Sequence, residues 1–400
     1  MFRYIRLDQK TLRRLALYLA PIALLFVLAL LVRGHGRIPY TAPIWVMNGV
    51  QARYLAMATH PFSMEALVRE PPFCWRILVP LIVHIMPVPA PTGFWFLTVL
   101  GLAVATLALE WFLRGLDLPP AAASAGGFAF VLLGPAVGFT LWDYMLVDPV
   151  SFALLALALG CAVHRRGPLL LATLLIFAAM KETALVGAAF GIFWAFEKRD
   201  WQLLRWAVSG LLGVIGIIAV IRLAIPASAP YSYLTEMQTI LSATVDAWNV
   251  LLPLAILQLI HRPRVWRSLA FVSVLIIANA QLIIAANTQR LVVYAFPVVI
   301  AAAVFEIEYL AGRLQVSRWL LWVPALTLEF VWWAYRAGFH TAGDVFDAAT
   351  EHLADTATEQ ILLVGVTVLT ILVIGVLIFE RASAPSRPRR ASCPGGWRCG

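Results

Sequence analysis

Two adjacent residues of opposite charge interrupt a long apolar run of this sequence. Lys181 and Glu182 occur in "FAAMKETALVGAAF", inside an otherwise apolar stretch from Gly167 to Phe196. On insertion scales, a charged side chain at the centre of a membrane helix costs about 2.5 to 3.5 kcal/mol. Charged residues in such segments usually face the protein interior and mark binding sites or proton pathways. We therefore treat Lys181 and Glu182 as candidates for a functional site.

Other charged residues that could meet this pair stand at the ends of separate apolar segments. They are Arg76 in "EPPFCWRILVP", Asp143 and Asp148 in "FTLWDYMLVDPVS", and Arg290 in "ANTQRLVVYAFP". Adjacent helical residues point about 100° apart, so Lys181 and Glu182 cannot neutralise each other well. We predict that Lys181 meets Asp148 or Asp143. Glu182 should meet Arg290 or Arg76.

Structural roles for these charges stay open. The ion pairs could hold the chain in place at Lys181 without any chemistry. Asp148 precedes Pro149, which suits the first turn of a helix, so the Asp148 carboxylate could instead cap that helix. Arg222, near the end of a predicted helix, is expected to extend its charge toward the membrane surface.

The composition identifies the class of protein that must position these residues. Hydrophobic residues make up 62% of the 400 residues and charged residues 13%, against about 45 to 50% and 25% in soluble domains. Apolar segments near the roughly 20 residues needed to cross a bilayer recur along the chain, which favours helices over a barrel. We predict an all-α polytopic membrane protein. The net charge of +9 is then explained by basic loops on the cytoplasmic side of the membrane, and no nucleic-acid partner is indicated.

About ten transmembrane helices are predicted from the apolar segments. They cover residues 15–32, 93–113, 119–140, 149–163, 203–225, 248–261, 268–286, 291–310, 319–335 and 360–379. The stretch 167–196 would be about 45 Å long as one helix, against a hydrocarbon core of about 30 Å. We predict two antiparallel half-helices there, 168–180 and 183–196. They form a re-entrant hairpin or, if each crosses the membrane, raise the number of spans to twelve.

The basic loops set the predicted topology. With a hairpin at Lys181, the basic residues 164–166 lie on the same side as Lys198 and Arg199, as the positive-inside rule requires. This arrangement predicts a multi-pass membrane protein with both termini in the cytoplasm. Lys181 then emerges at the outer face.

Residues 1–380 are predicted to form one integral membrane domain with three long outer segments. These segments are residues 33–92, 226–247 and 336–359. In the first, Trp45, Met47, Val50, Tyr54, Leu55 and Met57 suggest an amphipathic helix that lies in the membrane interface. Residues 381–400, rich in Pro, Ser and Arg, are expected to be a disordered basic cytoplasmic tail.

The converging charges suit a substrate with an anionic head and a long apolar tail. Lys181, Arg290 and Arg76 could bind a lipid phosphate. A carboxylate of Asp148, Asp143 or Glu182 could take the proton from an acceptor hydroxyl. The implied reaction is glycosyl transfer from a polyprenyl-phosphate sugar. No metal-ligand spacing or cofactor motif is found, so no cofactor is expected and a divalent cation is not indicated.

The order of the motifs over residues 40–310 resembles the GT-C class of polyprenyl-phosphate-sugar-dependent glycosyltransferases. The segments that carry the resemblance are "PFCWRILVP", "LVDPVSFALLALAL", "MKETALV" and "TQRLVVYAFPVVI". It implies a protein of the bacterial inner membrane and an acceptor that is an envelope glycan, lipid or protein, with membrane lipids around the site. GT-C enzymes place a catalytic carboxylate soon after the first helix, but "RGHGRIPYTAPIWVMNG" contains no acid. Later in that loop, Glu65 and Glu70 are the alternative bases.

Two other functional classes stay open. The same charges could form the substrate or proton site of a transporter or lipid flippase, although only one clear broken segment is found. The chain could also be a non-catalytic scaffold of an envelope-polymer assembly. No protein partner is indicated by the sequence.

Overall fold

The computed structural model describes most of the chain up to Arg336. The described residues are 9–35, 49–61, 63, 68, 71–227, 247–261, 265–280 and 292–336, all within the unit Met1–Val345. Several predictions lie outside them: Glu65, Glu70 and Arg290, the span 360–379, nearly all of the outer segments 226–247 and 336–359, and the tail 381–400.

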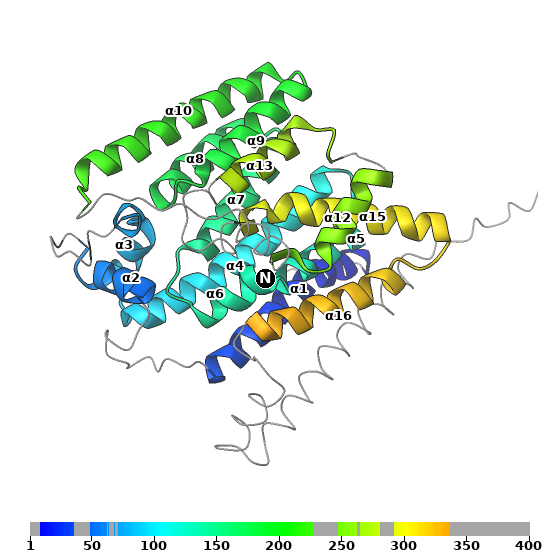
Figure 1. Cartoon of the computed structure of the whole chain (residues 1–400), viewed down its shortest axis with the longest axis horizontal. Coiled ribbons are helices and arrows are strands. Elements are labelled where there is room, and N and C mark those ends of the chain that lie inside the picture. Colours follow the sequence, from blue (N-terminus) through cyan, green and yellow to red (C-terminus); the bar gives the residue numbers. More distant parts are fainter. Residues whose placement is uncertain are drawn as a thin grey trace, which may run out of the picture. The chain divides into compact units, whose positions relative to one another are not determined.

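The described part of the chain is helical and contains no strand (Figure 1). Its elements are α1 (Gln9–His35), α2 (Gly49–Thr59), η2 (Phe73–Trp75), α3 (Leu78–Ile85), α4 (Ala90–Gly115), α5 (Pro120–Val131), η3 (Gly134–Gly138), α6 (Phe139–Trp142), α7 (Asp148–Val163), α8 (Gly167–Met180), α9 (Ala184–Glu197), α10 (Trp201–Ala224), α12 (Leu251–His261), α13 (Leu269–Ala280), η5 (Val293–Ala295), α15 (Phe296–Leu314) and α16 (Trp319–Arg336).

Within the described ranges, three segments are long and apolar enough to cross a membrane on their own. They are α4, α10 and the combined segment Val293–Leu314. Shorter apolar helices accompany them, including Ala16–Val32 in α1, all of α7, α8 and α9, and Trp319–Val331 in α16. The fold is therefore all-helical and consistent with a helical membrane protein.

The span predicted at 119–140 is not one straight helix. It is divided into α5 and the segment Gly134–Trp142, which meet at an angle of 53°. Gly134 and Pro135 stand at the start of the second segment. Pro lacks a backbone N–H and disrupts the preceding helical turn, and Gly weakens a helix, so the break has a local cause.

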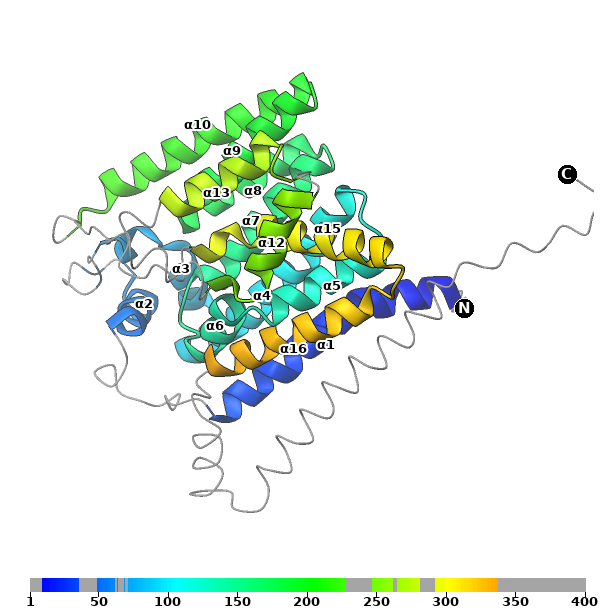
Figure 2. The same cartoon turned by 45° about the vertical axis from the view of Figure 1, so that its right-hand side comes forward.

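The hairpin predicted around Lys181 is present as two helices. α8 ends at Met180 and α9 begins at Ala184, so residues 181–183 form the turn between them. Both helices pack against α10, and α13 packs against α9 (Figures 1 and 2). We call the end of the bundle that carries residues 181–183 the tip end. The opposite end, with residues 164–166 and 198–200, is the loop end.

Among the described helices, α4 packs most extensively against α7, and this contact fixes the start of α7 at the tip end. A Cβ atom on Gly101 of α4 would lie 2.8 Å from the carbonyl carbon of Pro149, so only Gly permits this approach. The Thr98 hydroxyl of α4 donates a hydrogen bond to the carbonyl oxygen of Tyr144, at 2.8 Å. Together these contacts position the turn that leads into Asp148.

The short elements α2, η2 and α3 also lie at the tip end. The amphipathic helix predicted from Trp45, Met47, Val50, Tyr54, Leu55 and Met57 was expected to lie in the membrane interface; Trp45 and Met47 are outside the described residues. Residues 51–58 of α2 are almost all buried. Tyr54, Met57 and Ala58 are each at most 2% exposed, because α2 packs against α3, η2 and α4. α3 has only eight residues, too few to span a bilayer.

Candidate functional site at the tip end

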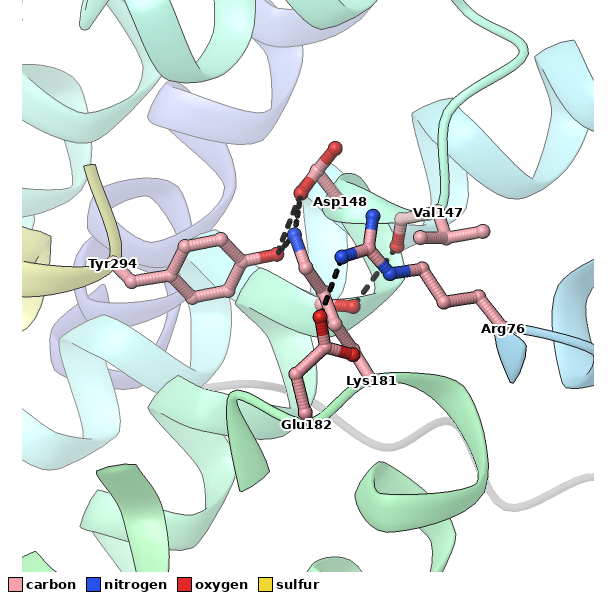
Figure 3. A network of polar contacts seen from close by, with 7 residues as sticks. Arg76, Val147, Asp148, Lys181, Glu182 and Tyr294 are labelled. Atoms are coloured by element: carbon pink, nitrogen blue, oxygen red, sulfur yellow. Dashed lines mark hydrogen bonds and ion pairs between the residues drawn. The ribbon is translucent and has the colours of Figure 1, made fainter. Parts of the chain in front are cut away.

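Lys181, Asp148 and Tyr294 form a buried polar cluster at the tip end (Figure 3). The Lys181 ammonium donates hydrogen bonds to Asp148 Oδ1 at 2.5 Å and to the Tyr294 hydroxyl oxygen at 3.0 Å. The Tyr294 hydroxyl donates in turn to Asp148 Oδ1, at 2.7 Å. The Lys181 and Asp148 side chains are 1% and 0% exposed. The predicted meeting of Lys181 with Asp148 is confirmed.

Three chain segments that are distant in sequence bring these groups together. Lys181 follows the last residue of α8 in an extended conformation, while its N–H still bonds to the carbonyl oxygen of Phe177. Asp148 is the first residue of α7, and Tyr294 lies in the short turn η5 before α15. Each group is therefore held at a helix junction.

The alternative role of Asp148 as a helix cap is wrong. Val147, and not Asp148, occupies the N-cap position of α7, and its side chain makes no cap hydrogen bond. The carboxylate of Asp148 instead faces Lys181 and Tyr294, because a buried ammonium requires a counter-charge. Pro149 in the first turn lacks a donor, so one fewer backbone N–H needs a cap.

Arg76 and Glu182 form a second ion pair beside the first. Arg76 Nη2 lies 2.5 Å from Glu182 Oε1, and the two side chains are 8% and 33% exposed. The predicted meeting of Glu182 with Arg76 is confirmed. Arg76 directly follows η2, and the Phe73 ring of that turn lies 5.8 Å from its guanidinium carbon.

Charge keeps both members of this second pair ionised. Burial raises the pKa of Glu182, but the charge and hydrogen bond of Arg76, together with Lys181, outweigh it and lower the pKa to about 2. Burial likewise opposes the charged form of Arg76, yet the Glu182 carboxylate holds the pKa of Arg76 above its ordinary value. At neutral pH the pair is a full salt bridge.

Asp143 accepts a hydrogen bond from a different side chain. Gln51 of α2 donates a hydrogen bond from Nε2 to Asp143 Oδ1 at 2.8 Å, and the Asp143 residue is 2% exposed. The prediction offered Asp143 and Asp148 as equal partners for Lys181, and the structure selects Asp148. Asp143 fixes α2 on the turn before α7 instead.

Arg222 and Trp75 form the accessible edge of the site. The Arg222 guanidinium carbon lies 4.7 Å from the Trp75 ring centre, and Trp75 Nε1 donates to the carbonyl oxygen of Ile225 at 3.1 Å. Both side chains line a small cavity together with Lys181 and Glu182. At about 10 Å³ this cavity has room for about one water molecule. A larger ligand must therefore contact Glu182 and Arg222 from their exposed sides.

Sequence reasoning missed two polar partners at the tip end, Tyr294 and Gln51. Tyr294 stands four positions after Arg290, in a motif that was singled out only for Arg290. A buried Tyr hydroxyl usually needs a polar partner, and this was the available signal. Gln51 gave no comparable signal, because nothing in its segment distinguishes it from a surface amide.

No protein-family model and no curated protein gives a significant match to the chain. Over the described ranges, no three His, Cys, Asp or Glu side chains are grouped so that they could hold a metal ion. The function must therefore be argued from the two ion pairs and their surroundings.

Proposed function

We propose that this chain is a GT-C-like glycosyltransferase of the bacterial inner membrane. It transfers a sugar from a polyprenyl-phosphate donor to an envelope glycan, lipid or protein acceptor. In this proposal the chain has about ten spans plus the hairpin α8–α9, or twelve spans, with the tip end outside and both termini in the cytoplasm. The observation that carries it is the Arg76–Glu182 pair, a partly exposed carboxylate held beside cations at the tip end.

Accessibility selects Glu182 among the three proposed carboxylates. A general base must reach the proton of the acceptor hydroxyl directly or through one water. Asp148 is 0% and Asp143 2% exposed, whereas the Glu182 side chain is 33% exposed. We assign Glu182 as the base. Asp148, with Lys181 and Tyr294, then positions the turn that carries it.

Exposure also decides which cations could bind the donor phosphate. Lys181 is buried and directly bonded to Asp148, so its charge is already compensated. The exposed Arg222 is the guanidinium that a donor phosphate reaches first. Arg76, whose side chain is 8% exposed and paired with Glu182, becomes a second phosphate ligand when the Glu182 carboxylate moves away from it. Arginine binds phosphate oxygens with bidentate geometry. Arg290, outside the described residues, remains a proposed phosphate ligand from the sequence alone.

The surface of α10 suits the apolar tail of such a donor. Leu212, Ile215 and Leu223 are 65%, 52% and 85% exposed, on the helix that also carries Arg222. An exposed apolar surface of this kind matches lipid chains rather than water. A polyprenyl phosphate could therefore place its chain along α10 and its phosphate near Arg222.

Donor binding would also activate the base. In this proposal the donor phosphate displaces the Glu182 carboxylate from Arg76, and the pKa of Glu182 then rises from about 2 toward an ordinary value of about 4.3. The acceptor oxygen attacks the anomeric carbon, the bond from that carbon to the phosphate oxygen breaks, and the phosphate leaves with the electron pair. The hydroxyl proton passes to Glu182.

The test uses purified protein in lipid nanodiscs with a radiolabelled polyprenyl-phosphate sugar. Glu182→Gln should lower sugar transfer by about 10² to 10⁴-fold, the usual contribution of a general base. Glu308→Gln is the matched control, because Glu308 pairs with Arg318 at 2.9 Å with a similar exposure of 22%, but near the loop end of α15.

Equal turnover by the Glu182→Gln and Glu308→Gln proteins would exclude Glu182 as the base. Transport of the intact donor across the membrane without release of its phosphate would favour the flippase alternative. A wild-type protein that shows neither activity, but whose loss alters the envelope polymer, would favour the scaffold.

A further inference from the structure

A second set of cations surrounds a cavity at the loop end, far along α8 and α9 from Lys181. The cavity measures about 500 Å³ and is lined by the junctions α7–α8 and α9–α10. Its charged lining residues are Arg165, Lys198, Arg199 and Asp200. We propose that this cavity binds a phosphate ester group, and that its source is the head group of an anionic phospholipid.

The acidic residues of this region are already occupied as helix caps. Asp200 Oδ1 accepts a hydrogen bond from the N–H of Leu203 at 2.9 Å and so caps α10. Glu197 accepts from the Ser268 hydroxyl at 2.8 Å and from the N–H of Ala270 at 3.2 Å, at the start of α13. Because both carboxylates accept hydrogen bonds from backbone N–H groups, they neutralise the neighbouring cations less effectively.

The cations, by contrast, are only weakly compensated. Arg165 lies 3.6 Å from Asp200 and its side chain is 64% exposed. The Lys198 ammonium lies 4.7 Å from the ring centre of Trp194. Across the described segments, neither Lys198 nor Arg199 forms an ion pair with an acid. Three cations therefore face one cavity against a single carboxylate, which leaves room for an anion.

The flanks of the cavity identify a lipid as the source of that anion. Trp201 lines the cavity and is 65% exposed, and Trp206 lines it on the next turn of α10. Exposed Trp side chains mark the level of the lipid head groups. Leu169 of α8 and Leu212 of α10, which are 47% and 65% exposed, continue the surface toward the membrane interior. A bound head group would have its acyl chains on this apolar surface.

The backbone conformation of Arg165 and Arg199 allows both charges to be removed with little change to the backbone. Arg165 and Arg199 have φ angles of 56° and 51°, a left-handed conformation that Asn adopts more readily than most residues. The variant Arg165→Asn/Arg199→Asn removes two charges and keeps the backbone. Lys198→Gln is a second variant on ordinary helical backbone. Arg313→Gln is the matched control, because Arg313 is exposed near the loop end of α15 but does not line this cavity.

The measurement is lipid binding to the full chain in detergent, by native mass spectrometry and by the shift in unfolding temperature. Phosphatidylglycerol should bind more tightly than phosphatidylcholine. Each removed charge should weaken phosphatidylglycerol binding about fivefold, as expected for a basic residue near an anionic membrane surface. Arg313→Gln should change binding by less than twofold. Soluble glycerol phosphate, the second arm, should not compete at millimolar concentration.

Two results would overturn the proposal in different parts. If the double variant and Lys198→Gln bind phosphatidylglycerol as wild type does, or no more weakly than Arg313→Gln, the cations act only as a diffuse charge. If glycerol phosphate competes and its binding depends on the same residues, the cavity is a site for a soluble phosphate ester and the lipid source is wrong. Neither result depends on sugar transfer at the tip end.

Discussion

At the tip end, cations and carboxylates are buried against each other, whereas at the loop end the cations face outward. Lys181 and Asp148 have 1% and 0% exposed side chains and share a hydrogen-bonded tyrosine. Arg165 at the loop end is 64% exposed and lies 3.6 Å from Asp200. Asp200 and Glu197 at the loop end accept hydrogen bonds from the starts of helices, while Asp148 and Glu182 at the tip end neutralise cationic side chains.

This difference indicates different uses of charge. A buried pair fixes the chain, because neither partner can be removed without an uncompensated charge in a desolvated place. An exposed pair contributes little to stability and leaves its cation available to a ligand. Between these extremes, Arg76 and Glu182 are paired, yet the carboxylate is still partly accessible. That combination is the reason the proposed chemistry is assigned to Glu182.

The largest expected effect comes from Lys181→Met. The substitution leaves Asp148 buried without its counter-charge, and loss of one partner of a buried pair typically destabilises a protein by about 3 to 5 kcal/mol. Arg165→Asn at the loop end should lower the free energy of unfolding by less than about 1 kcal/mol. Unfolding of both variants by SDS in mixed micelles measures the two changes under the same conditions.

A compensating variant serves as the control for this prediction. Lys181→Met/Asp148→Leu removes both charges and should recover a large part of the loss, since apolar replacements of a buried pair are often neutral. Equal destabilisation by Lys181→Met and Arg165→Asn would remove the distinction between the two ends.

A smaller effect is expected from Tyr294→Phe. The ring remains, but the hydrogen bonds that join Tyr294 to Lys181 and Asp148 are lost. Loss of hydrogen bonds to charged groups typically costs about 1.5 to 3 kcal/mol. The matched control is Tyr309→Phe, near the loop end, whose hydroxyl accepts a hydrogen bond from exposed Arg313 at 3.3 Å. The same unfolding assay should show a clearly larger loss for Tyr294→Phe, and the reverse order would contradict the buried cluster.

The pairing at the tip end was predictable because a lone Lys in an apolar helix must find an acid elsewhere. The choice between Asp148 and Asp143 was not, since both stand in one loop five positions apart. Gln51 and the contact of Thr98 with Tyr144 decide it, and these are properties of the packed structure.

The helices themselves were largely predictable from apolar length and from the basic loops. The break within 119–140 was missed, because the apolar composition continues through "GPAVG". Gly134 and Pro135 were the signal for it. The burial of α2 was missed for another reason: its apolar residues suggested an interfacial helix, and nothing local shows that α3, η2 and α4 cover it.

The smallest expected effect is the pH dependence of the stability that the partly exposed Arg76–Glu182 pair contributes. The pKa of Glu182 is about 2 in the folded protein and about 4.3 in the unfolded chain. Its stabilising contribution is therefore complete above about pH 4.5 and is lost as the pH falls toward 2. With solvent screening of the partly exposed carboxylate, we expect the free energy of unfolding to change by about 1 kcal/mol between pH 6 and pH 3.

Glu182→Gln should remove this part of the acid sensitivity, while Glu308→Gln should retain it. Unfolding measured from pH 3 to pH 8 tests this, and an acid response shared by wild type and Glu182→Gln would show that Glu182 is not held by Arg76.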